Sequence, residues 1–283
     1  MPRTKIRFAR PGDERALHDF LGRHADSSLY LRFFLAQGGL VDESKPLQGT
    51  YVAAFDGAAV VGVAMHSWQD VVFLQAPVRA ADLAKAVVEA SGRTLSALLG
   101  PFSQVEEAHR GLGERPASKR AKEGLYALSI DELIGPDLGS ASLMCRPARS
   151  EDLAFLLDWR FQYEMESTGL PDTDGTREYA SSAIKEHVDR GEAFILEADG
   201  KPVSLCTRNA RAAESIQIGG VWTPSELRNR GYGRAVVAGV LREAARDGVT
   251  RAVLFTENPA ARRSYEALGF RQIGDYGITI YPT

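Results

Sequence analysis

The chain has 283 residues, and at about 150 residues per domain this length predicts two domains. Apolar residues make up 44% and charged residues 25% of the sequence, which excludes a disordered chain, a collagen and a coiled-coil rod. The formal net charge of −3 gives no general attraction to nucleic acid or to anionic lipid. No apolar stretch approaches the roughly 20 residues that span a bilayer, so we expect no membrane association. The two cysteines, Cys145 and Cys206, cannot form a disulfide framework, and we expect a soluble cytoplasmic protein.

The first half predicts alternating helices and strands. A short strand leads into an amphipathic helix with Leu17, Phe20 and Leu21 on its apolar face. A hairpin follows, turning at Asp56-Gly57. We then expect, in chain order, a strand at 71–75, a helix at 80–91, a strand at 94–99, a helix at 101–112 and a polar loop at 113–123.

The second half predicts a similar order of elements. Its hydrophobic periodicity and breaker residues predict strands near 142–147, 214–222 and 251–255, helices at 151–165, 175–190, 232–247 and 259–268, a hairpin at 193–209, a turn at 223–231 and a final pair of strands over 270–281. This order is typical of an α/β fold in which helices cover both faces of a mixed sheet.

The chain repeats itself. The pattern Arg7-x-Ala-Arg-x-x-Asp13 recurs as Arg146-x-Ala-Arg-x-x-Asp152, 139 positions later. The Asp-Gly hairpin recurs around Asp199, 143 positions after the first. Matching order and nearly matching offset predict two related domains in tandem, at 1–135 and 140–283. The linker between them is the breaker-rich stretch 135–140.

A glycine-containing turn joins a predicted strand to the helix at 232–247. It reads Arg228-Asn-Arg230-Gly231-Tyr-Gly233-Arg234. Backbone N–H groups at a helix N-terminus bind anions, glycine lets the backbone approach a phosphate, and arginine recognises phosphate oxygens. An ordinary solvated turn is the alternative. The turn is neither a Walker A loop nor a G-x-G-x-x-G fingerprint, because valine stands at 236.

Two segments together resemble one family. Arg228-x-x-Gly231-x-Gly233 is similar to the Q/R-x-x-G-x-G/A loop of the GNAT N-acetyltransferase superfamily. Asn258-Pro-Ala-Ala-Arg-Arg-Ser-Tyr265-Glu-Ala-Leu-Gly-Phe resembles the second signature of that superfamily. The resemblance covers about residues 142–283. It implies tandem GNAT-like domains of mixed α/β class, of which the N-terminal one is degenerate.

The resemblance also implies a cosubstrate and roles for particular residues. The loop would hold the pyrophosphate of acetyl-coenzyme A, and Asn258, which also caps a helix, would touch the pantetheine arm. A backbone N–H within Val221–Thr223, with Val221 favoured, would bind the thioester oxyanion. Tyr265 would protonate the departing thiolate, its alternative being a core aromatic. The cofactor-binding set is Val221, Thr223, Arg228, Arg230, Gly231, Tyr232, Gly233, Arg234 and Asn258.

The sequence says less about the acceptor and the general base than about the cosubstrate site. Glu164, Glu166 and Glu214 are candidates for taking the amine proton, and we take Glu214 as the predicted catalytic base, although each could be only a solvated surface residue. Acids at 164, 166, 172 and 174 favour a cationic amine. The five histidines show no ligand spacing, so we expect no metal.

The first half lacks the signatures of the second. After the strand at 71–75 comes a single arginine, Arg79, with no glycine before Gly92, and no tyrosine matches Tyr265. The sequence therefore predicts an N-acetyltransferase with one site. It would act on a small-molecule or protein amine, without nucleic acid, as a monomer or homodimer. The alternatives are a non-catalytic module that senses acyl-CoA or another ligand, and an aminoacyl transferase that uses charged tRNA.

Overall fold

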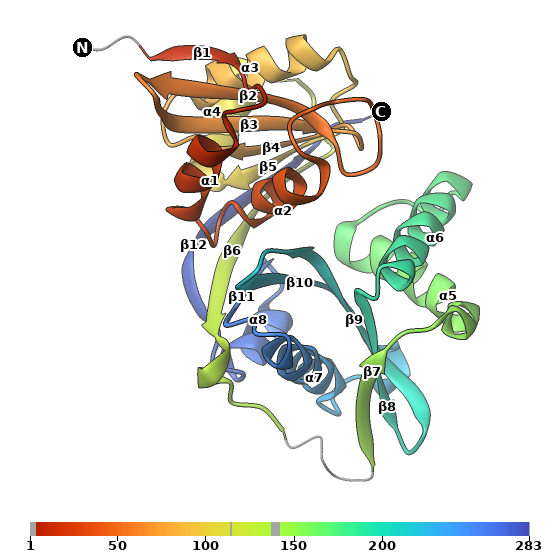
Figure 1. Cartoon of the computed structure of the whole chain (residues 1–283). Coiled ribbons are helices and arrows are strands. Elements are labelled where there is room, and N and C mark those ends of the chain that lie inside the picture. Colours follow the sequence, from red (N-terminus) through yellow and green to blue (C-terminus); the bar gives the residue numbers. More distant parts are fainter. Residues whose placement is uncertain (1–3, 114, 137–141, 283) are drawn as a thin grey trace. The chain divides into compact units, whose positions relative to one another are not determined.

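The computed structural model describes residues 4–113, 115–136 and 142–282, and by its contacts the chain divides into two compact units (Figure 1). Unit 1 holds the chain up to Tyr126, Phe255–Glu257 and the segment from Gln272 onward, and unit 2 holds Ala127–Leu254 and Asn258–Arg271. We predicted domains at 1–135 and 140–283. The observed division differs because the last strand of the chain belongs to unit 1. Residues 137–140 of the predicted linker lie outside the described residues.

Unit 1 is built on a mixed sheet. Its elements are β1 (Lys5–Phe8), α1 (Glu14–Gly22), α2 (Leu29–Gly38), β2 (Gly49–Asp56), β3 (Ala59–Ser67), β4 (Val71–Gln75), α3 (Ala80–Ser91), β5 (Ala97–Pro101), α4 (Phe102–Gly111), most of β6 (Lys119–Ser129) and nearly all of β12 (Arg271–Ile280). The strand order is β1-β2-β3-β4-β5-β12-β6. On one face, α3 and α4 pack in a cluster with Val72 and Leu74. On the other, Tyr30 and Phe34 of α2 contact Phe73, because neighbouring strand residues face opposite sides.

Unit 2 carries the strands β7 to β11. Its elements are the end of β6, β7 (Leu143–Pro147), α5 (Leu153–Tyr163), the π-helical turn η3 (Glu164–Thr168), α6 (Asp174–Asp189), β8 (Ala193–Ala198), β9 (Lys201–Arg211), β10 (Ser215–Trp222), α7 (Tyr232–Arg246), most of β11 (Arg251–Thr256) and α8 (Pro259–Glu266). Short 3-10 turns lie at Ile130–Glu132, Ser150–Asp152 and Ser225–Leu227. The strand order is β11-β10-β9-β8-β7. Leu156 and Ile184 pack α5 and α6 on one face, and α7 packs on the other (Figure 1). The mixed α/β class predicted from the sequence is confirmed.

The repeated sequence pattern forms the same contact in both units. Arg7 binds both carboxylate oxygens of Asp13, at 2.6 and 2.8 Å. Arg146 binds both oxygens of Asp152, at 2.8 and 2.9 Å. Each aspartate also accepts the backbone N–H of the residue three positions before it. The two segments therefore share local structure as well as sequence.

Two of the secondary-structure predictions, for residues 113–123 and 270–281, are wrong. Residues 113–123 were expected to form a loop, but β6 begins at Lys119. Its start is fixed by a distant partner, since Ser118 N–H donates to the Ile280 carbonyl at 2.8 Å. The final pair of strands over 270–281 is one strand, β12, whose residues Tyr276–Ile280 pair with β5. Both errors concern strands that form through long-range pairing, which local polarity does not reveal.

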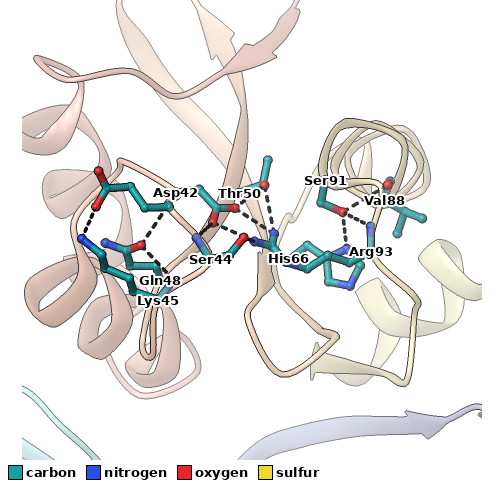
Figure 2. A network of polar contacts seen from close by, with 10 residues as sticks. Asp42, Ser44, Lys45, Gln48, Thr50, His66, Val88, Ser91 and Arg93 are labelled. Carbon is teal, nitrogen blue, oxygen red and sulfur yellow. Dashed lines mark hydrogen bonds and ion pairs between the residues drawn. The ribbon is translucent and has the colours of Figure 1, made fainter.

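A polar network fastens the 39–48 loop of unit 1 to the end of α3 (Figure 2). Arg93 forms two hydrogen bonds with the Asp42 carboxylate, at 2.7 and 2.8 Å. Thr50 donates to the same carboxylate at 2.7 Å. Beside it, the buried His66 ring contacts Ser91 Oγ at 2.7 Å. The Arg93 and Thr50 hydrogen bonds lower the pKa of Asp42 to about 2.

We expect Asp42→Asn to lower the free energy of unfolding at pH 7 by about 2 kcal/mol, from a pKa near 2 in the folded chain against 3.8 unfolded. Because the folded pKa is the lower one, this stabilisation is complete above the unfolded pKa and is lost as the pH falls through about 2. The difference between wild type and variant should shrink to roughly half near pH 3. Urea unfolding of both proteins at pH 7 and pH 3 measures it. Asp82→Asn, at an exposed ion pair with Arg79, is the control and should change little. A pH-independent difference for Asp42→Asn would contradict the prediction.

Candidate functional site

A cavity of about 450 Å³ lies within unit 2, where β10 ends and α7 and α8 begin. It is lined by Glu166, Ser167, Val221, Trp222, Thr223, Leu227, Arg228, Asn229, Gly231, Tyr232, Gly233, Arg234, Asn258, Ala260, Ala261, Ser264 and Tyr265. The structure thus brings both signature segments, which are far apart in sequence, to one cavity. Nine of the eleven predicted site residues line it; Arg230 and Glu214 do not.

The wall formed by β10 is irregular. Within the described residues, β10 pairs in parallel with β11 at Ser215, Ile216 and Gln217. The strand β10 itself continues to Trp222. On its other side, the pairing with β9 shifts register between Gly219 and Trp222. A bulge of this kind bends a strand and redirects its groups, and bulges are common beside active sites.

The glycine turn presents open backbone donors to the cavity. Gly231 is the N-cap of α7 with φ +80°, a conformation that favours glycine. No side chain caps this helix end, so the first N–H groups of α7 are available to a ligand. A Cβ at Gly233 would meet only ordinary contacts, from Thr223 and Val221. The positive φ at position 231 therefore favours glycine. At position 233 the absence of a side chain leaves the first turn of α7 uncovered.

Arg228 is held by the protein itself. Its Nε donates to the Thr223 carbonyl at 3.0 Å, and its Nη1 and Nη2 bind the Glu166 carboxylate at 2.6 and 2.9 Å. The guanidinium also lies over the Trp222 ring, 4.7 Å from its centroid. Arg228 thus connects the turn to η3. The Nη1 and Nη2 donors are engaged with Glu166, and Arg228 also lines the cavity.

The other two arginines of the turn are exposed. Arg234 lines the cavity, and its Nη2 lies 3.9 Å from the position that a Cβ on Gly231 would take. Arg230 contacts only the edge of the turn, where its Nη2 donates to the Glu226 carbonyl at 3.5 Å. Of the two, Arg234 is the one placed to meet an anion at the start of α7.

Thr223 and Val221 form the strand side of the cavity. The Thr223 hydroxyl contacts Ser204 Oγ at 2.9 Å, and Ser204 Oγ also donates to the Trp222 carbonyl at 2.9 Å. These bonds fix the backbone as it leaves β10. The strand end that could bind an oxyanion through a backbone N–H is thereby held in place.

The second signature forms α8 as its residues predict. The Asn258 side chain accepts the N–H groups of Ala260 and Ala261, at 2.8 and 3.3 Å, and Pro259 is the first residue of the helix. Tyr265 is half-buried at the cavity and packs edge-on against Phe270, with ring centroids 6.0 Å apart. Asn258 is therefore confirmed as a helix cap and lies beside the cavity.

Glu214 is remote from this cavity. It precedes Ser215 at the start of β10, and its backbone carbonyl accepts N–H groups from Thr250 and Arg251. The cavity lies at the other end of the strand, roughly 20 Å away along an extended chain. The structure does not bring Glu214 and Tyr265 together.

Most of the acids near η3 are paired within the chain. Glu164 is 2% exposed and binds Arg160. Glu166 binds Arg228, and Asp172 binds Arg177 at 2.9 Å. Three of the four acids that favoured a cationic amine therefore have arginine partners within the chain.

Sequence reasoning missed several parts of the cavity wall. Trp222 stands between two predicted residues, and Ser264 directly precedes Tyr265, so both could have been found from their neighbours. The π-helical turn η3, which brings Glu166 and Ser167 to the cavity, has no sequence signal of its own. Turns of this type occur frequently at functional sites.

The described residues contain neither a metal-binding cluster nor a membrane-spanning helix. No group of three or more histidine, cysteine or acidic side chains in that part of the chain could hold a metal ion. None of its helices combines the length and apolarity needed to cross a membrane.

Comparison with known proteins shows which family matches a segment of unit 2 and which solved structures have a similar fold. Residues 154–270 match the model of the acetyltransferase (GNAT) family. A search of curated proteins finds no match. A solved Drosophila protein is 16% identical with a TM-score of 0.67, and 99% of each chain is covered.

Two solved bacterial proteins are similar as well. A GCN5-related N-acetyltransferase from Sphaerobacter thermophilus is 18% identical with a TM-score of 0.59, covering 100% of this chain and 97% of its own. A GNAT acetyltransferase from Colwellia psychrerythraea is 13% identical with a TM-score of 0.53, covering 98% and 100%. At these identities the structures share the fold. The family match spans the glycine turn and Tyr265, and the segment that it covers, residues 154–270, belongs to the acetyltransferase (GNAT) family.

Proposed function

We propose that unit 2 binds acetyl-coenzyme A in the cavity and transfers the acetyl group to a primary amine. The observation that carries this proposal is the meeting of uncapped helix N–H groups at Gly231 with Asn258 and Tyr265 around one cavity. A pyrophosphate suits the start of α7, because backbone donors and the helix dipole favour an anion there. Arg234 adds a positive charge at the same place.

The residues present account for the chemical steps. The amine nitrogen forms a bond to the thioester carbon while the carbon–sulfur bond breaks, and the carbonyl oxygen becomes transiently negative. A backbone N–H at Val221 would stabilise that oxygen. The sulfur leaves as a thiolate, and Tyr265 would supply its proton. The ammonium proton of the acceptor passes to solvent or to a carboxylate, and the remoteness of Glu214 argues against its assignment as the base.

Unit 1 supports the proposal of a single site. At the matching turn, Arg79 takes the left-handed conformation at the start of α3, with φ +60°. Side chains from α4 occupy backbone donors there: Gln104 accepts the Ala76 N–H at 2.5 Å, and Glu107 accepts the Ala81 N–H at 3.3 Å. An internal carboxylate thus lies where a phosphate would bind. We infer that unit 1 is a degenerate copy without a coenzyme site.

Isothermal titration of the full chain with acetyl-CoA tests the proposal, and we expect one site per chain. The full chain is required, because unit 1 includes β12 and unit 2 includes residues 127–135, so fragments cut near 137 would lose parts of both units. Two equivalent sites would contradict the assignment of unit 1. Thiol release with an amine panel then separates an enzyme from a non-catalytic module that only binds acyl-CoA.

A further inference from the structure

Glu166 and Arg228 form an ion pair within the candidate site. Both residues line the cavity of unit 2. The Glu166 carboxylate accepts a hydrogen bond from each terminal nitrogen of Arg228, from Nη1 at 2.6 Å and from Nη2 at 2.9 Å. The Glu166 side chain is 54% exposed and the Arg228 side chain 36% exposed. The pair is therefore accessible to a ligand that enters the cavity.

The two hydrogen-bonding edges of the Arg228 guanidinium already have partners. A guanidinium binds an anion in fork geometry along the edge formed by its two terminal nitrogens or along the edge that includes Nε. Glu166 occupies the first edge, and the Thr223 carbonyl accepts the Nε–H of the second at 3.0 Å. A phosphate can therefore bind Arg228 in fork geometry only by replacing one of these two partners.

Of the two partners, Glu166 is the one that can leave. Thr223 directly follows Trp222, which is 4% exposed and lies against the Arg228 guanidinium, 4.7 Å from ring centroid to carbon. The Thr223 carbonyl thus belongs to a buried and well-packed strand end. Glu166 belongs to the single π-helical turn η3, where Glu166 and Ser167 are both exposed. Exposed ion pairs contribute little to stability, so a competing anion can displace Glu166 at little cost.

We propose that Glu166 is a built-in competitor of the cosubstrate: the diphosphate of acetyl-coenzyme A displaces its carboxylate from Arg228 and thereby releases η3. This inference rests on the proposed function, which brings the diphosphate to the start of α7. Arg228 stands three residues before Gly231, the N-cap of that helix. A diphosphate carries more negative charge than one carboxylate and is also bound by the helix N–H groups. It therefore outcompetes Glu166 for the guanidinium.

Glu166→Gln tests the competition, because glutamine keeps the length of the side chain but loses the charge that binds Arg228. Isothermal titration of the full chain with acetyl-CoA measures Kd. We expect Kd to fall by about two- to fivefold, the effect of one exposed ion pair. Asp172→Asn is the control, since Asp172 is an exposed acid near η3 that binds Arg177 at 2.9 Å and is not among the described residues that line the cavity. That variant should bind acetyl-CoA like wild type.

Arg228→Gln separates competition from direct repulsion. Removing a negative charge from the cavity also favours an anion there without any exchange of partners at Arg228. The exchange predicts that Glu166→Gln lowers Kd in the wild-type background and has little effect in the Arg228→Gln background. An equal change of Kd in both backgrounds would show that Glu166 only repels the phosphate, and the inference would be wrong.

Hydrogen exchange of the wild-type chain decides the question even if a variant fails to fold. On saturation with acetyl-CoA, we expect the amides of residues 164–170 to exchange faster and those of the first turn of α7 to exchange more slowly. Unchanged or slower exchange at 164–170 would mean that η3 is not released, which overturns the inference alone. An unchanged Kd for a folded Glu166→Gln protein does the same. Absence of acetyl-CoA binding to wild type overturns the proposed function instead.

Discussion

Gly231→Asp is expected to abolish acetyl-CoA binding while the chain stays folded. The substitution places a carboxylate at the open start of α7, where no side chain caps the helix. Two like charges about 5 Å apart, at an effective dielectric constant near 20, repel by roughly 3 kcal/mol, which is about 100-fold in Kd or more. Aspartate tolerates a positive φ better than most residues, and no atom other than Arg234 Nη2, at 3.9 Å, lies within 4 Å of the new Cβ.

Isothermal titration measures the affinity, and circular dichroism with thermal unfolding checks the fold. Gly200→Asp is the matched control. Gly200 also has a positive φ, of +73°, with open space at its Cβ position, but it lies in the β8–β9 turn away from the cavity. The control should bind acetyl-CoA like wild type. Unchanged affinity in a folded Gly231→Asp protein would mean that the glycine turn is only a turn.

Tyr265→Phe is expected to reduce kcat by about 10²–10⁴, the usual contribution of general acid catalysis. The change removes only the hydroxyl. The ring keeps its edge-on contact with Phe270, so stability should change little. In the proposed site acetyl-CoA would be held mainly at the start of α7, so its Kd should move by less than roughly tenfold. Single-turnover acetyl transfer, with an acceptor found in the panel, measures the chemical step.

Removal of a tyrosine hydroxyl in unit 1 provides the control for Tyr265→Phe. Tyr281→Phe in unit 1 removes a hydroxyl that contacts His109 Nδ1 at 2.9 Å. That loss should cost about 1 kcal/mol of stability without changing the rate. If Tyr265→Phe and wild type transfer acetyl at equal rates while chemistry limits turnover, Tyr265 has no part in proton transfer. Thiolate departure would then be unassisted or assisted by water.

Features that rest on local chemistry could be predicted from the amino-acid sequence alone. Asn258 followed by Pro259 starts a helix by its own chemistry. The Asp-Gly pairs at 56–57 and 199–200 mark hairpin turns, in which Gly57, Asp199 and Gly200 have positive φ. The strand 71–75 and the helix 80–91 were predicted at their observed bounds. The glycine turn could also be located from local chemistry, because Gly231 adopts a positive φ that residues with a side chain adopt less easily.

Contacts between distant residues could be seen only in the folded chain. Arg228 was predicted from the sequence as a phosphate ligand, and only the structure shows that its guanidinium also binds Glu166, 62 residues away. A polar stretch became β6, and a presumed pair of strands became the single strand β12, because their partners are remote. Such pairings depend on how the whole chain packs, and local residue preferences carry too little free energy to specify them.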